Sequence, residues 1–208
     1  MKKQSRIGQK QRVLDLLGRN GIMRLSEFLA HGIHAPTLAR LVNEGTVIRP
    51  SRGLYELDGA EISMGHSLAE AAKRVPKGVV CLVSALNFHQ ITLQNPNWVW
   101  VAIGEKSRKP KFTTPPARFV RFGARALRTG VETHIIDSVP VNITSAAKSV
   151  VDCFRFRNTV GLDVALEALR MSLRQRKTTP DEIAKLARKL RIWSVLRPYI
   201  EGTVADEG

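Results

Sequence analysis

The sequence predicts an α+β protein built from two domains. In residues 7–57, apolar residues at helical spacing are followed by two short strand-like runs. Further strand-like runs occur between residues 79 and 143, and helical spacing returns after Thr144. The pattern breaks at Asp58-Gly59-Ala60, which predicts a boundary there. We therefore expect a first domain over residues 1–60 and a mixed α+β domain over residues 61–208 that ends in a helical segment.

The first domain is expected to begin with three helices. Apolar residues at helical spacing predict a helix over residues 7–19, closed by Asn20-Gly21. A second helix is expected over residues 25–31, with Gly32 as its C-terminal cap. The third has Pro36 near its first position, where the missing N–H costs nothing, and it ends at Gly45. Its apolar stripe consists of Leu38, Leu41 and Val42.

A hairpin is expected to follow these helices. Val47–Arg49 and Leu54–Leu57 have strand character, and Pro50-Ser51-Arg52-Gly53 joins them. Two helices around a glycine turn, followed by such a hairpin, are typical of a winged helix-turn-helix. That fold holds one helix in the major groove of DNA while the hairpin contacts the backbone. The first domain is therefore predicted to bind DNA.

The second domain is expected to mix strands and helices. The predicted strands are Val79–Val83, Trp98–Ile103, Phe119–Phe122, Thr133–Ile136 and Val139–Ile143. The predicted helices are His66–Arg74, a segment from Ser84 as N-cap to His89, Ser145–Phe156 with Thr144 as N-cap, Leu162–Arg174, a helix after residue 179, and Ile192–Ile200. Thr179-Pro180-Asp181-Glu182 has the residues of a capping box.

Composition limits the class of partner. The formal net charge of +15 and the pI near 10.6 favour an anionic partner, most often nucleic acid or a membrane surface. No run reaches the roughly 20 apolar residues of a membrane span, and the N-terminus has no signal-peptide core, so we expect a cytoplasmic protein. Cys81 and Cys153 belong to no zinc or disulfide motif and are expected to be buried or semi-buried thiols.

The exposed face of the third helix carries the strongest functional signal. Thr37, Arg40 and Asn43 recur every three residues, so their side chains project in roughly one direction. Arginine can bind guanine as a fork, and asparagine can pair with adenine. Any exposed helix face holds polar residues, but the adjoining turn, the hairpin and the basic charge favour DNA contact here.

The hairpin and the N-terminus add further candidate contacts. Arg49, Ser51 and Arg52 lie at a loop tip beside Gly53 and suit phosphate oxygens or the minor groove, although a solvated turn is the alternative. The chain also starts with a basic lead-in, which could follow the DNA backbone and supply salt-dependent affinity. It comprises Lys2, Lys3, Arg6, Lys10 and Arg12.

A second basic cluster lies in the second domain. Eight cationic residues and no acidic one occur between Lys106 and Arg128. They are Lys106, Arg108, Lys109, Lys111, Arg118, Arg121, Arg125 and Arg128. A solvated loop explains the cluster as well as a nucleic-acid groove does, and that groove could take more of the DNA or an RNA.

Signals for catalysis are weak. None of the five histidines has metal-ligand spacing on a helix, and no nucleophile elbow surrounds Ser84. Asp163 and Glu167 lie one helical turn apart without the lysine that a nuclease cluster requires. No Walker loop or dinucleotide fingerprint occurs. We therefore expect no enzyme activity, metal or cofactor.

Several segments resemble the AbiEi-type antitoxins of type IV, abortive-infection toxin–antitoxin systems. The likeness runs from about residue 9 to residue 200, through GIMRLSEFLAHGIHAPTLARLVNEGTVIRPSRGLYEL, LAEAAKRVPKGVVCLVSALNFHQIT, NPNWVWVAI and ITSAAKSVVDCFRFRNTVGLDVALEALR. The resemblance implies an N-terminal winged helix that represses its own promoter at inverted repeats. It also implies a C-terminal domain that neutralises a nucleotidyltransferase-like toxin. Carried to this chain, the recognition helix is Ala35–Glu44 and the wing is Arg49–Tyr55.

The sequence thus predicts a DNA-binding transcriptional regulator that acts as an antitoxin. Its expected partners are its own promoter DNA and a nucleotidyltransferase-like toxin, whether or not the two proteins touch. One alternative is a stand-alone repressor whose second domain senses a ligand or protein. Another, from a different class, is a nuclease whose first domain finds its substrate.

Overall fold

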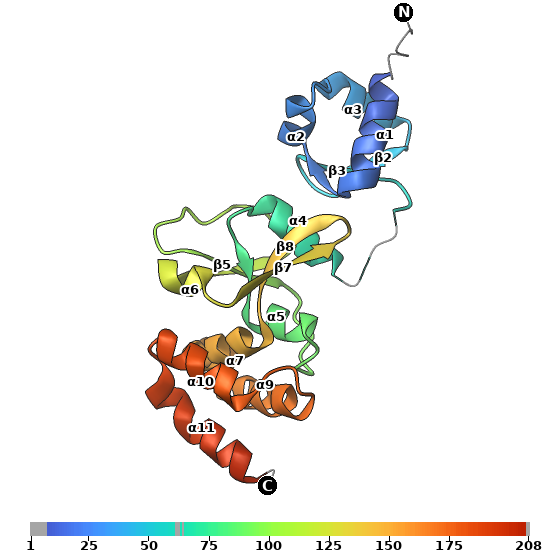
Figure 1. Ribbon diagram of the computed structural model, residues 1–208. Helices are drawn as coiled ribbons and strands as arrows, with labels where there is room; N and C mark the ends of the chain where they lie inside the picture. Colours follow the sequence, from blue (N-terminus) through green and yellow to red (C-terminus); the bar gives the residue numbers. More distant parts are fainter. Residues whose placement is uncertain (1–7, 61–62, 64, 207–208) are drawn as a thin grey trace, which may run out of the picture. The chain divides into compact units, whose positions relative to one another are not determined.

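The computed structural model describes residues 8–60, 63 and 65–206. It consists of two compact units (Figure 1). The small unit comprises the described residues up to Arg74 together with Ile135–Pro140, and the large unit comprises Val75–His134 and the described residues from Val141 onward. Both units combine helices and strands, so the mixed α+β class is confirmed.

The small unit contains four helices among its described residues and a three-stranded antiparallel sheet of order β1-β3-β2. Its elements are α1 (Gln9–Asn20), β1 (Met23–Arg24), α2 (Leu25–Ala30), α3 (Ala35–Asn43), β2 (Val47–Ile48), β3 (Leu54–Leu57) and α4 (His66–Arg74). Phe28, Leu38 and Leu41 are completely buried in its core. The three predicted helices and the hairpin strands are therefore present. Strand β1 was not predicted, because two residues are too few to establish a period.

Two glycines shape the helix ends of the small unit. Gly32 follows α2 in the left-handed region, with φ of 70°, as expected for a residue that ends a helix. Gly21 follows α1 with φ of 59°, and a Cβ there would overlap the carbonyl oxygen of Asp137. Glycine at position 21 therefore allows both the turn and the close approach of the segment Ile135–Pro140.

The large unit contains a five-stranded mixed sheet of order β6-β5-β4-β8-β7. Strand β4 pairs antiparallel with β5 and parallel with β8, whereas β5 and β6 are parallel neighbours. The strands and the helices between them are β4 (Val79–Val80), α5 (Leu82–Phe88), β5 (Val99–Gly104), β6 (Ala117–Phe122), α6 (Ala124–Arg128), β7 (Val131–Ile136) and β8 (Val139–Thr144).

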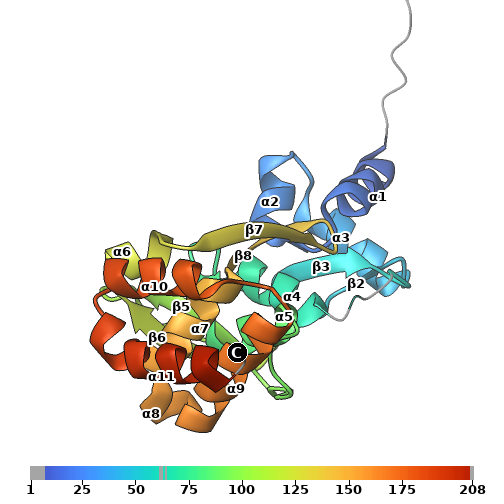
Figure 2. The same ribbon diagram turned by 60° about the horizontal axis from the view of Figure 1, so that its bottom comes forward.

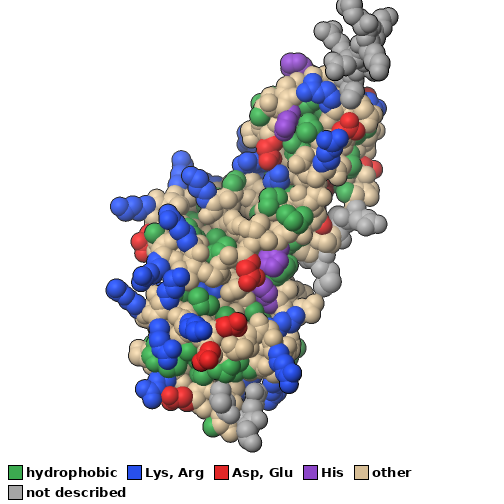
Figure 3. Space-filling view, in the orientation of Figure 1, with side chains coloured by type: hydrophobic (Ala, Val, Ile, Leu, Met, Phe, Trp, Pro, Cys, Tyr) green, Lys and Arg blue, Asp and Glu red, His purple; other side chains and the backbone are tan. Residues whose placement is uncertain are grey.

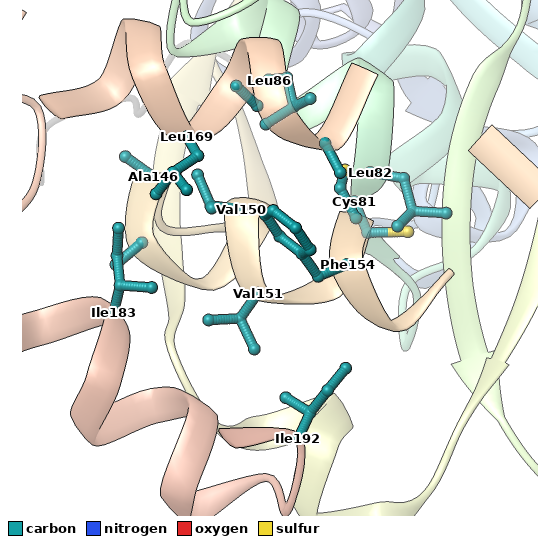
Figure 4. Packing of buried hydrophobic residues seen from close by; sticks show 14 of the residues in the cluster. Cys81, Leu82, Leu86, Ala146, Val150, Val151, Phe154, Leu169, Ile183 and Ile192 are labelled. Atoms are coloured by element: carbon teal, nitrogen blue, oxygen red, sulfur yellow. The ribbon is translucent and has the colours of Figure 1, made fainter. Parts of the chain in front are cut away.

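The C-terminal helices surround α7, as Figures 1 and 2 show. They are α7 (Ala146–Arg155), α8 (Arg157–Val160), α9 (Leu162–Arg174), α10 (Pro180–Lys189) and α11 (Trp193–Asp206). Val150, Val151 and Phe154 of α7 are fully buried, and they meet side chains from α5, α9 and α10 in the core (Figure 4). The predicted capping box is confirmed, since the Thr179 side chain accepts from the backbone N–H of Glu182.

Four expectations about the large unit are wrong. The strand predicted over Val79–Val83 ends at Val80, and Ser84 lies inside α5 rather than at its cap. The Ser84 hydroxyl instead accepts from the backbone N–H of Trp100 at 2.9 Å, so it ties α5 to the sheet. The N-cap of α7 is Ser145, not Thr144. The last helix runs on to Asp206, with Pro198 inside it.

One buried ion pair lies in the core of the large unit. Lys148 and Asp152 are one helical turn apart on α7, form a salt bridge, and are both completely buried. Burial raises the pKa of Asp152 to about 6, although Lys148 opposes that change. Cys81 and Cys153 are buried beside this pair, as expected, and burial raises their thiol pKa values. None of the helices in the described residues has the length and apolar character to cross a bilayer.

Candidate nucleic-acid interface

Helix α3 presents its polar face to solvent. Leu38 and Leu41 point into the core and are fully buried, whereas Arg40 and Asn43 are exposed and Thr37 is half-buried. The side chain of Arg40 is 62% exposed. The three side chains named by the sequence therefore lie on the accessible side of the helix, where they can reach a ligand together.

Glu44, at the end of α3, holds two cations near this face. Lys10 donates to its carboxylate at 2.8 Å, and the Nε of Arg40 lies 3.6 Å from its other oxygen. The hydrogen bond from Lys10 is the main reason that the pKa of Glu44 is lowered. Since exposed ion pairs of this kind are weak, Arg40 can exchange Glu44 for another acceptor at small cost.

The basic lead-in divides into two parts. Lys2, Lys3 and Arg6 lie outside the described residues. Lys10 contacts Glu44, and Arg12 donates to the carbonyl of His31 at 2.6 Å. These two cations therefore hold α1 against the end of α3 and against the turn between α2 and α3.

The β2–β3 turn exposes two arginines. Arg49 and Arg52 are exposed, and the Arg49 guanidinium lies 5.9 Å from the centroid of the Tyr55 ring. Ser51 is half-buried, and its hydroxyl accepts a hydrogen bond from Arg74. Arg74 also donates to the carbonyl of Arg52 at 2.8 Å. Sequence reasoning missed Arg74, because no local pattern links a helix end to a turn more than 20 residues before it.

The second basic cluster lies in the large unit, and its members differ in their contacts. Arg121 donates to the carbonyls of Gly104, Glu105 and Ser107 and so holds the start of the β5–β6 loop. The Arg118 guanidinium lies over the Trp98 ring, 3.5 Å from its centroid. Four others, Lys106, Arg108, Lys109 and Lys111, are exposed and form no ion pair with any described residue. Figure 3 shows Lys and Arg side chains along one edge of the large unit.

The structure also assembles groups that the sequence did not bring together. An open pocket of about 440 Å³ in the large unit is lined by His89, Lys177, Lys185, Glu132 and Glu182, among others. It holds charges of both signs, and Glu182 already accepts from Thr178 at 2.8 Å. Within residues 8–60, 63 and 65–206, no three His, Cys, Asp or Glu side chains are grouped so that they could hold a metal ion.

The N-terminal segment matches a known family. Residues 11–57 match the family model described as a transcriptional regulator, the AbiEi antitoxin. That match identifies the N-terminal segment as AbiEi-like. The resemblance inferred from the sequence is thus confirmed over these residues, which include α3 and the β2–β3 turn.

The fold of the whole chain also has a solved counterpart. The crystal structure of the RV2827C protein from Mycobacterium tuberculosis aligns with a TM-score of 0.59 and 13% sequence identity. The alignment covers 96% of this chain and 82% of that one. At this identity the likeness shows a shared fold alone. No curated protein matches the chain.

Proposed function

We propose that the protein is a DNA-binding transcriptional regulator and the antitoxin of a type IV toxin–antitoxin system. The small unit acts as a winged helix-turn-helix, with α3 as recognition helix and the β2–β3 turn as wing. The observation that carries the proposal is the polar face of α3 within the AbiEi-like segment, where Arg40 and Asn43 are exposed and Thr37 is half-buried. Arg49, Ser51 and Arg52 of the wing contact phosphate or the minor groove.

The remaining parts of the proposal concern the partners. The DNA is the protein's own promoter, which it represses at inverted repeats, and the protein acts in the cytoplasm. The large unit neutralises a nucleotidyltransferase-like toxin, with or without direct contact. Lys106, Arg108, Lys109, Lys111, Arg118 and Arg121 form a second surface for nucleic acid, supported by their exposure and by the absence of acidic residues from Lys106 to Arg128.

Binding to DNA tests the first half of this function. The purified full chain is titrated with its own upstream DNA and with a scrambled duplex at several salt concentrations. Arg40→Ala should lose about 1–3 kcal/mol of discrimination between the two DNAs, because its guanidinium fork reads a base. Arg52→Ala should weaken binding to both DNAs alike. Arg19→Ala, which removes an exposed cation at the end of α1, is the matched control for charge. An unchanged specificity ratio in Arg40→Ala would refute base readout by α3.

Growth rescue tests the second half. The full chain is co-expressed with a nucleotidyltransferase-like toxin, taken from the neighbouring gene where that gene encodes one, and the toxin is placed under an unrelated promoter. We expect the double variant Arg40→Ala/Arg52→Ala to rescue growth as well as the native chain, since neutralisation needs no operator contact. If the native chain rescues growth and the double variant does not, neutralisation depends on DNA binding. If neither rescues growth, the chain is a stand-alone repressor.

A further inference from the structure

The wing is held by Arg74, which lies 22 positions after Arg52 of the turn. At the end of α4, one nitrogen of the Arg74 guanidinium donates to the carbonyl of Arg52 at 2.8 Å, and the other donates to the hydroxyl of Ser51. One rigid, planar group thus contacts two consecutive residues of a short turn. Such a fork restricts the turn more than a single donor does.

Helix α4 is itself attached to the rest of the small unit near both ends. Lys73, next to Arg74, donates to Glu27 at 3.0 Å, and Glu27 also accepts the backbone N–H of Arg24 at 2.6 Å. At the start of α4, His66 lies 2.8 Å from the carboxylate of Asp137. Because α4 is attached at both ends, the guanidinium of Arg74 has a defined position beneath the turn.

The contact also decides what Ser51 can offer a ligand. A hydroxyl has one proton to donate and lone pairs to accept with. Since Arg74 donates to the Ser51 oxygen, the hydroxyl proton of Ser51 is available for an acceptor. Phosphate oxygens are acceptors only, so this arrangement suits a phosphate better than a donor group.

Three guanidinium groups gather around this turn. Arg49 and Arg52 are exposed, and Arg74 is half-buried. Burial is the main reason that the pKa of Arg74 is lowered, and the positive charge of Arg49 adds to the effect while Glu70 opposes it. Like charges held close together favour an anion that neutralises them.

We propose that Arg74 of α4 is part of the DNA interface as a positioning residue, which braces the β2–β3 turn so that Ser51 and Arg52 meet the phosphate backbone. The inference rests on the proposed function. It also extends the DNA-binding element beyond residues 1–60 to the end of α4.

Two kinds of measurement test this inference on the full chain. Binding to upstream and scrambled DNA is compared for Arg74→Ala, Arg74→Lys, Arg52→Ala and the double variant Arg74→Ala/Arg52→Ala, with Arg19→Ala as the control for net charge. Amide exchange is followed at Leu54 and Leu25, because their N–H groups donate to Ser51 at 3.1 Å and to Gly53 at 3.0 Å, both within the turn.

We expect Arg74→Ala to weaken binding to both DNAs about ten-fold and to leave their ratio unchanged. The double variant should lose less than the product of the two single losses, because Arg74 acts through Arg52. Arg74→Lys keeps the charge but not the fork, so it should rescue affinity only in part. Exchange at Leu54 should be faster in Arg74→Ala, while exchange in the core helix α3 is unchanged.

Several results would overturn the inference. An Arg74→Ala variant that behaves like Arg19→Ala, or losses that simply multiply in the double variant, would remove the positioning role. If Arg74→Lys binds DNA with the full affinity of the native chain, Arg74 contributes through its charge alone and not through the fork. Faster exchange throughout α3 would make Arg74 a general stabiliser of the small unit. If the native chain binds no DNA, the proposed function fails, and exchange at Leu54 still decides whether Arg74 braces the turn.

Discussion

The two units divide the charge of the protein unequally. Residues 1–74 and 135–140 hold 12 basic and 8 acidic residues, whereas the rest of the chain holds 21 basic and 10 acidic residues. The unit that carries the AbiEi-like segment is therefore the less basic one. Most of the net charge, which first pointed to an anionic partner, belongs to the large unit.

The cations are also used differently in the two units. In the small unit, Lys10, Arg12, Lys73 and Arg74 are bonded to groups of the same unit and hold its helices and turn in place. In the large unit, the four cations from Lys106 to Lys111 extend from a loop. Contacts of cations with phosphates supply salt-dependent affinity, whereas contacts with base edges supply the choice of sequence. Net charge is thus a poor guide to which unit selects the site.

The largest expected effect concerns the core of the large unit. Lys148→Met leaves Asp152 buried without its partner, and it should lower the free energy of unfolding by about 3–5 kcal/mol. Trp98, Trp100 and Trp193 all lie in the large unit, so tryptophan fluorescence during chemical denaturation reports on that unit alone. The loss should shrink when the pH is lowered from about 8 to about 5, because Asp152 then takes up a proton.

The control for that prediction is the double variant Lys148→Met/Asp152→Leu, which removes both charges. It should recover most of the lost stability, since a buried ion pair is often no better than an apolar pair of similar volume. If Lys148→Met is as stable as the native chain, the ion pair of Lys148 and Asp152 does not contribute the expected free energy of unfolding.

The second prediction tests whether the large unit supplies affinity for DNA while the small unit supplies the choice of DNA sequence. Replacing Lys106, Arg108, Lys109 and Lys111 by alanine should reduce the salt dependence of DNA binding by about 0.9 in log–log slope for each phosphate that the variant no longer neutralises. The ratio between upstream and scrambled DNA should stay the same. Arg40→Ala should do the reverse, with a changed ratio and a slope lower by at most about one. An unchanged slope in the four-fold variant would remove the large unit from the DNA interface.

The smallest expected effect concerns pH and the small unit. Burial raises the pKa values of Glu56 and Glu70 in the folded state. Between the unfolded-state and folded-state pKa values of these two groups, the folded state therefore binds more protons than the unfolded state. The free energy of unfolding consequently falls as the pH rises through the folded-state pKa values. We expect the small unit to gain stability on mild acidification from neutral pH.

Glu70→Gln tests the source of that pH dependence. It should stabilise the small unit at neutral pH by about 1 kcal/mol and flatten its pH profile, because a buried charge is removed. Amide exchange in α1 and α3 is the measurement, since the small unit holds no tryptophan. Asp58→Asn, at an exposed carboxylate, should leave the profile unchanged. A steeper profile in Glu70→Gln would contradict the assignment.

Much of the local structure could be predicted because its causes are local. Pro36 at the start of α3, glycine after α2, and the capping box at Thr179 act within a few residues, and the structure contains all three. One error arose because two neighbouring residues offer the same chemistry. Thr144 and Ser145 both have side chains that can cap α7. Strand β8, in which Ile143 pairs with Val80, includes Thr144, so Ser145 is the first residue after the strand and caps the helix.

The sequence by itself determined the α+β class, the order of most helices and strands, and the polar face of α3, because periodicity and capping are encoded within one element. Only the tertiary structure decided which distant groups meet. Arg74 reaches Ser51, Lys10 reaches Glu44, and Glu167 accepts from Thr92. These contacts join residues 23, 34 and 75 positions apart. Their partners depend on how helices pack, which no spacing along the chain records.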